Sequence, residues 1–144
     1  MQKYSILLLR LGLGSTLIMA GLLKFTTEGW STDQFLTSAT NGPFAELFQS
    51  LVGVAVVTPL VVYGELLMGA ALILGLAMRF TGLVVSLYFA LLWLDLLQRT
   101  VVDEHLIYVF LGLLFYSAKD HLFNLDDKLA FLKKKHKVFK SIMS

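Results

Sequence analysis

The sequence predicts an all-α integral membrane protein: a four-helix bundle with an interfacial helical loop between spans one and two and a basic C-terminal amphipathic helix. Of its 144 residues, 57% are hydrophobic and the mean hydropathy is +0.76, which is more apolar than a water-soluble domain of this size. Four apolar runs have roughly the 20 residues that a helix needs to cross a bilayer core of about 30 Å. Seven lysines follow the last run.

The composition also excludes several kinds of chemistry. The chain has no cysteine, so it cannot form a disulfide, a thiolate nucleophile, a Cys-ligated zinc site or an iron–sulfur cluster. Its three histidines are divided, with His105 on one predicted side of the membrane and His121 and His136 on the other. We therefore expect neither haem nor another metal site, and no nucleic-acid partner.

The first span is predicted from Tyr4 to Phe25. It is longer than the apolar core of a signal peptide and lacks a clear small-x-small cleavage site, so we expect it to be retained. The loop after it, to about residue 50, is acidic. There Ser31 and Gln34 resemble a capping box, and a second short helix is expected from Pro43. The aromatic residues of this loop suit the membrane interface.

The second span is predicted from Pro59 to Met78, with Thr58 as the N-cap. The third is predicted from Thr81 to Gln98, and the fourth and shortest from Glu104 to Ala118. Small residues four apart allow helices to approach closely in lipid. On this basis we expect seams at Gly82, Ser86 and Ala90, at Gly14 and Gly21, and at Gly64, Ala71 and Gly75.

The basic residues predict the orientation. Lys3, Arg79 and the tail over residues 119–144 share one side, opposite the acidic first loop, so the positive-inside rule places both termini in the cytoplasm. Arg99 is the exception. The tail is read as an amphipathic helix on an anionic lipid surface, or alternatively as a solvated segment.

Ionisable residues from all four spans are predicted to meet in the outer half of the bundle. A charge in the hydrocarbon region costs roughly 2.5–3.5 kcal/mol on insertion scales, so each needs a partner or a cavity. We assign acid–base roles to Glu65, Asp95 and His105. Substrate binding is assigned to Lys24, Arg99 and Tyr108.

Simpler interpretations stand beside this one. Lys24, Arg99 and Glu104 could extend to headgroups, and Asp95 with Arg99, one turn apart, could form a structural pair. Arg10 and Arg79 are given structural or network roles, and a buried pair between Arg10 and Glu65 is a further hypothesis.

Short motifs along most of the chain resemble the DoxX/DoxD family of small four-span membrane proteins. The ordered charges Arg10, Lys24, Glu65 and Arg79 carry most of the resemblance. The motifs are Leu9-Arg10-Leu11-Gly12-Leu13-Gly14, Ala20-Gly21-Leu22-Leu23-Lys24-Phe25, Gly42-Pro43-Phe44-Ala45, Gly64-Glu65-Leu66-Leu67-Met68-Gly69 and Asn124-Leu125-Asp126. The sequence departs from the family at Lys119-Asp120-His121, where a Gly-x-Gly-Arg element is common.

The loop motif resembles the DoxD branch, whose described members are the small membrane subunit of thiosulfate:quinone oxidoreductase. The resemblance implies quinone-linked electron transfer from thiosulfate, a quinone as cofactor and a second oxidoreductase subunit as partner. Membrane lipid and further copies of the chain are also expected partners. The alternative is a noncatalytic membrane scaffold or lipid-binding module of a redox complex.

Overall fold

A computed structural model describes residues 2–38, 44–96, 104–118, 122, 124 and 125. These residues form helices and connecting turns with no strand among them, so the predicted all-α class is confirmed. The helices are α1 (Gln2–Thr26), α2 (Asp33–Ser38), α3 (Ala45–Ser50), α4 (Val57–Leu74), α5 (Met78–Leu96) and α6 (Glu104–Ser117).

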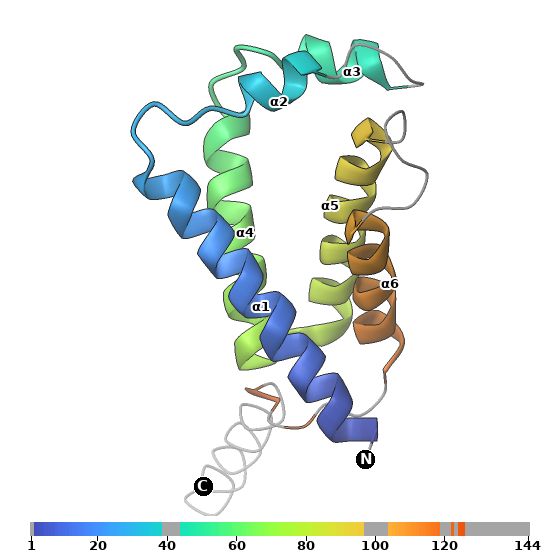
Figure 1. The fold of residues 1–144 in the computed structure, drawn as a ribbon. Helices are drawn as coiled ribbons and strands as arrows, with labels where there is room; N and C mark the ends of the chain where they lie inside the picture. Colours follow the sequence, from blue (N-terminus) through green and yellow to red (C-terminus); the bar gives the residue numbers. More distant parts are fainter. Residues whose placement is uncertain (1, 39–43, 97–103, 119–121, 123, 126–144) are drawn as a thin grey trace, which may run out of the picture.

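The four long helices form two closely packed pairs. Helix α1 packs along α4, and α5 packs along α6, whereas contacts between the pairs are far fewer. Figure 1 shows the pairs joined near the turn between α4 and α5 and diverging toward the other end, where α2 and α3 lie across the opening.

Glycines bring the backbones of each pair together. A Cβ atom at Gly69 would lie 2.7 Å from the carbonyl oxygen of Gly14, and one at Gly82 would lie 2.7 Å from that of Gly112. Such contacts are shorter than Cβ atoms tolerate, so only glycine permits them. The predicted seams at Gly14 and Gly82 are confirmed, and their partners Gly69 and Gly112 were not predicted. The predicted seam at Gly64 is wrong, because a Cβ there would meet nothing within 4 Å.

The outward faces of the helices are apolar. Helix α4 exposes Leu60, Tyr63, Leu67 and Leu74, and α5 exposes a similar stripe. A soluble helix turns its polar face outward, so this pattern fits lipid contact. Within the described residues, Lys3–Thr26 and Val57–Leu74 are long and apolar enough to cross a membrane. Two further apolar helices, Met78–Leu94 and Glu104–Ser117, are shorter, and four crossings remain a prediction.

The predicted boundary between the second and third spans is wrong. Helix α4 ends at Leu74, because Gly75 adopts a left-handed conformation (φ 69°) and closes the helix. Ala77 also has a positive φ of 43°. Met78 therefore begins α5 instead of ending α4.

The predicted start of the second span is also wrong. Helix α4 begins at Val57, and its N-cap Val56 forms no side-chain cap. Thr58 Oγ1 instead accepts a hydrogen bond from the Thr32 N–H (3.2 Å) and bonds the Thr32 hydroxyl (2.9 Å). This residue thus joins α4 to the loop that leads into α2.

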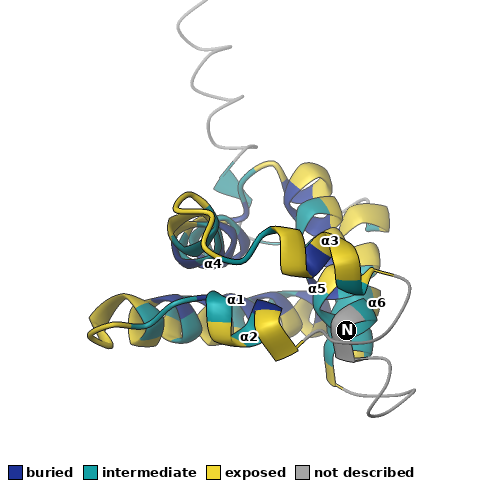
Figure 2. Cartoon of the chain, turned by 90° about the horizontal axis from the view of Figure 1, so that it is seen from above, coloured by how far each residue is buried: buried dark blue, intermediate teal, exposed yellow. Residues whose placement is uncertain are grey.

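The two short loop helices are confirmed, and together they cover the diverging ends of the pairs (Figure 2). Leu36 of α2 and Phe48 of α3 are buried together in a small separate hydrophobic core. The Gly53 N–H donates to Asp33 Oδ1 (2.9 Å), which fixes the end of this segment to its beginning. The predicted basic helix over 119–144 lies almost wholly outside the described residues.

Replacing Gly82 with alanine should separate α5 from α6. The new Cβ would lie 2.6 Å from the backbone nitrogen of Tyr116, and overpacking of this kind costs roughly 1–3 kcal/mol. We expect Gly82→Ala to lower the thermal unfolding midpoint in detergent. Gly12→Ala is the control, because a Cβ there meets nothing within 4 Å; an equal midpoint for both variants would contradict the seam.

Candidate functional site

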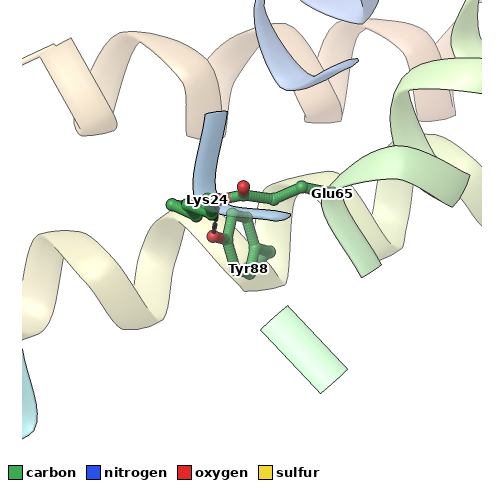
Figure 3. Close-up of polar contacts among 3 residues, drawn as sticks. All are labelled: Lys24, Glu65 and Tyr88. Carbon is green, nitrogen blue, oxygen red and sulfur yellow. Dashed lines mark hydrogen bonds and ion pairs between the residues drawn. The ribbon is translucent and has the colours of Figure 1, made fainter. Parts of the chain in front are cut away.

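Glu65 is a carboxylate buried inside the bundle, with 3% of its surface exposed. Lys24, in the last turn of α1, donates a hydrogen bond to Glu65 Oε1 and forms an ion pair with it. The hydroxyl of Tyr88, on α5, donates to the same oxygen. Figure 3 shows the three side chains directed toward one another. We call these residues the polar tie, because they connect α1, α4 and α5.

The α1–α4 seam explains why Lys24 reaches Glu65. Gly21 packs against the Val62 carbonyl oxygen and the Leu66 side chain, at 3.2 and 2.9 Å from its would-be Cβ. Lys24 lies almost one turn beyond Gly21, toward the start of the antiparallel α4, and its long side chain reaches back to Glu65, which stands between Val62 and Leu66 in the sequence. The hydrogen bonds offset part of the cost of keeping a charged pair away from water.

The second carboxylate oxygen, Glu65 Oε2, is buried without a hydrogen-bond partner among the described residues. Buried polar atoms are almost always paired. This oxygen consequently keeps an unused capacity to accept a hydrogen bond or a proton, which is a common property of ionisable groups at functional sites in membranes.

Trp30 covers Lys24 from the loop. Helix α1 is followed by a turn in which Gly29 has a φ of 72°, a conformation that favours glycine. The turn carries Trp30 back, so that the Lys24 ammonium lies 5.3 Å from the ring centroid. A cation over an indole ring is favourable, so Lys24 is held by a carboxylate on one side and an aromatic ring on another.

A cavity of about 440 Å³ adjoins the polar tie. Five of its lining residues have polar groups in their side chains, namely Lys24, Trp30, Thr32, Tyr88 and His105, whereas Glu65 is not a lining residue. The remaining lining is apolar: Phe35, Leu36, Phe48, Leu51, Val57, Leu60, Val61, Gly64, Met68, Leu91 and Leu92. An apolar cavity with a few convergent polar groups is typical of a small-molecule site.

Lys24 and Trp30 also line a second, smaller cavity of about 230 Å³. Its other lining residues include Thr27, Thr58 and Tyr63, which lie where α1 ends and α4 begins. Lys24 and Trp30 thus line both cavities, the smaller one beside the loop and the larger, mostly apolar one inside the bundle.

Two predicted residues of α6 lie near the site in different ways. His105 lines the large cavity, and its ring packs against Phe89 with centroids 6.0 Å apart. Tyr108 packs on the same ring at 4.7 Å and belongs to the hydrophobic core. The structure therefore brings His105 to the cavity but gives Tyr108 a packing position outside its lining.

The hypothesis of an Arg10–Glu65 pair is wrong. Arg10 is buried, with 1% exposure, but it lies 14 residues before Lys24 on the same helix. That separation is about 21 Å at 1.5 Å per residue. Gly14, four residues after Arg10, packs against Gly69, Leu72 and Ile73, so Arg10 lies near the C-terminal end of α4, and Lys24 instead pairs with Glu65.

The remaining predicted residues are spread out or lie outside the described parts. Glu104 and Arg79 are exposed, at the first turns of α6 and α5. The structure describes neither the side chain of Asp95 nor any part of Arg99, so their roles stay predictions. No group of three His, Asp or Glu side chains within the described ranges could hold a metal ion.

Two residues of the site were missed in the sequence. The prediction gives Tyr88 no role beyond its place in an apolar span, although its hydroxyl is one of few polar groups between Phe80 and Leu94. It includes Trp30 only among the interfacial aromatic residues of the loop. Tyr88 could have been identified from its hydroxyl group, because a polar group deep in a predicted span needs a hydrogen-bond partner in lipid just as a charge does.

Removing Lys24 should destabilise the protein more than neutralising Glu65. Lys24→Met leaves a buried carboxylate without its cation, at a cost of about 3 kcal/mol. In Glu65→Gln, Lys24 can extend to the interface. We expect the thermal midpoint in detergent to fall most in Lys24→Met and to recover partly in the double variant. Lys3→Met, at the exposed start of the same helix, is the control; equal losses from all variants would contradict the tie.

Comparison with known proteins gives one family match. No curated protein and no solved structure matches the chain significantly. The DoxX family model matches residues 5–97, a stretch that covers nearly all of α1, all of α2 to α5, and the three residues of the polar tie. Since this is well over half of the 144 residues, the chain belongs to the DoxX family of membrane proteins.

Proposed function

We propose that this protein is the membrane subunit of a quinone-linked oxidoreductase, and that the cavity beside the polar tie binds the quinone ring. One observation carries the proposal: a cavity of about 440 Å³, mostly apolar, has Lys24 and Tyr88 among its lining residues. Cavities of about 300–1,000 Å³ suit small ligands.

The lining residues fit such a ring. Phe35, Trp30 and Leu92 offer apolar and aromatic surface, while the Lys24 ammonium, which has three N–H groups, can donate a hydrogen bond to a quinone carbonyl oxygen in addition to the one that it donates to Glu65. The Tyr88 hydroxyl donates its single hydrogen to Glu65 Oε1, so its oxygen can accept a hydrogen bond from a quinol hydroxyl. His105, also among the lining residues, has ring nitrogens that can donate or accept a hydrogen bond.

A bound quinone would accept two electrons and two protons and so be reduced to the quinol. Among donors, we propose thiosulfate, two ions of which lose one electron each and join through a new S–S bond as tetrathionate. In this scheme two protons from water complete the quinol, and Glu65, with its unpaired Oε2, relays them one at a time through Tyr88, whose hydroxyl bonds its Oε1 and whose side chain lines the cavity.

The smaller cavity is the proposed binding site of the electron donor, thiosulfate. It is lined by Lys24 and by the hydroxyl-bearing residues Thr27, Thr58 and Tyr63, which suit an oxyanion better than the apolar cavity does. Lys24 borders both cavities and would adjoin both reactants. Arg99 is proposed to assist binding of the anion, and a partner subunit is proposed to complete the complex.

Quinone binding should quench the fluorescence of Trp30. The chain has two tryptophans, Trp30 and Trp93, so Trp93→Phe leaves a single reporter at the cavity wall. We expect saturable quenching by a tail-less benzoquinone or by menadione. Adding Tyr88→Phe removes the hydrogen bond that Tyr88 donates to Glu65, worth about 0.5–1.5 kcal/mol; the Lys24–Glu65 pair is then positioned less firmly, and quinone binding should weaken about two- to tenfold. Tyr116→Phe, an exposed tyrosine of α6, should not; equal, non-saturable quenching in all variants would reject the site.

Turnover distinguishes a catalytic subunit from a scaffold. Membranes that contain the protein should reduce a quinone analogue in the presence of thiosulfate, and Glu65→Gln should lower the rate at least tenfold, because it removes the proton-accepting carboxylate. The absorbance of the quinone reports the rate. If Glu65→Gln keeps the full rate while Gly82→Leu abolishes it, the protein acts as a scaffold instead.

A further inference from the structure

The large cavity is exposed on one side. Of the sixteen residues that line it, only Leu60 of α4 and Leu91 of α5 are exposed, at 68% and 49%. The other lining residues are buried or half-buried. The rim of the cavity therefore lies between α4 and α5, which belong to different helix pairs.

The fold leaves space at this rim. The two pairs diverge toward α2 and α3 (Figure 1), and α4 and α5 make few contacts with each other. Gly64 lines the cavity between Leu60 and the polar tie, and a Cβ added there would meet nothing within 4 Å. Unlike Gly69, this glycine faces open space and is not required for helix packing.

The rim faces lipid. Leu60 continues into the exposed apolar stripe of α4 that contains Tyr63 and Leu67, and Leu91 continues into that of α5 with Leu87. The α2–α3 end is covered differently, because Leu36 and Phe48 line the cavity there and are buried. An apolar opening on a lipid-facing surface suits a ligand that is dissolved in the bilayer.

We propose that Leu60, Gly64 and Leu91 form a lateral portal between the membrane and the cavity. The ring of a lipid-soluble quinone enters the cavity through this portal, and the linear apolar tail of the quinone remains in the portal between α4 and α5. The identity of the ring rests on the proposed function. The position of the tail rests on the exposed rim. Ring binding at the polar tie and tail binding at the portal can therefore be measured separately.

Because the chain has no cysteine, a single introduced cysteine reports on the portal. Leu60→Cys is placed at the rim, and Leu8→Cys, at a leucine of α1 with matching exposure (69% against 68%), is the control. Both are made in the Trp93→Phe background and reconstituted in phosphatidylcholine vesicles. The rate of modification by a membrane-permeant maleimide is measured with decylubiquinone, with a decyl-tailed naphthoquinone and with the corresponding tail-less rings.

A bound tail should slow labelling of Leu60→Cys at least fivefold and leave Leu8→Cys unchanged, while tail-less rings quench Trp30 without protecting Leu60→Cys. If the tailed quinone quenches Trp30 but labelling of Leu60→Cys stays at its original rate, the portal is wrong and the proposed function stands. If no quinone quenches Trp30, the proposed function fails and the portal fails with it.

A second pair of variants tests passage through the portal. Gly64→Phe places a ring in open space at the rim, and Gly12→Phe does so on α1, where a Cβ also meets nothing within 4 Å. We expect Gly64→Phe to slow the quenching of Trp30 by decylubiquinone in vesicles at least tenfold, with Gly12→Phe unchanged. Equal association rates for the two variants would show that the ring enters by another path.

Discussion

Burial of the Glu65 carboxylate constrains how the two halves of the bundle meet. Within each pair, glycines allow the helices to pack backbone against backbone, but α4 and α5 touch little. A charge in this apolar setting needs compensation, and Lys24 of α1 and Tyr88 of α5 supply it at the same oxygen. The polar tie thereby bridges the two pairs at the level where they have begun to diverge, and the cavity lies beside it.

The same arrangement gives the cavity its mixed character. Two diverging helix pairs present apolar faces, because both face lipid or core along most of their length, and α2 and α3 close the space with Leu36 and Phe48. The polar residues of the lining come from the ends of α1 and α6 (Lys24 and His105), from the middle of α5 (Tyr88) and from the loop. The ion pair with Glu65 and the Trp30 ring hold Lys24 in place. Such a cavity favours a ligand that is apolar at one end and accepts hydrogen bonds at the other, as a lipid quinone does.

The class of the fold and most of its elements were predictable. Hydropathy and run length identified the four long helices, because a segment that must satisfy every backbone group internally is a continuous apolar helix. Turn chemistry identified α2 and α3. The boundaries were less accurate: Gly75 ends α4 earlier than the apolar run does, and Thr58 bonds Thr32 instead of capping its own helix. Both details depend on local backbone conformation and on a residue distant in sequence.

The sequence by itself determined that Glu65 and Lys24 are costly residues in apolar spans that require partners, because the price of a buried charge is fixed by residue type and depth. Only the tertiary structure decided which partners they have. Helix register, set by glycine contacts such as Gly21 on Leu66, brings the side chain of Lys24 to Glu65 and leaves Arg10 far away. The divergence of the helix pairs likewise placed Tyr88 and His105 at one cavity, since the distance between helices depends on side-chain packing along their whole length.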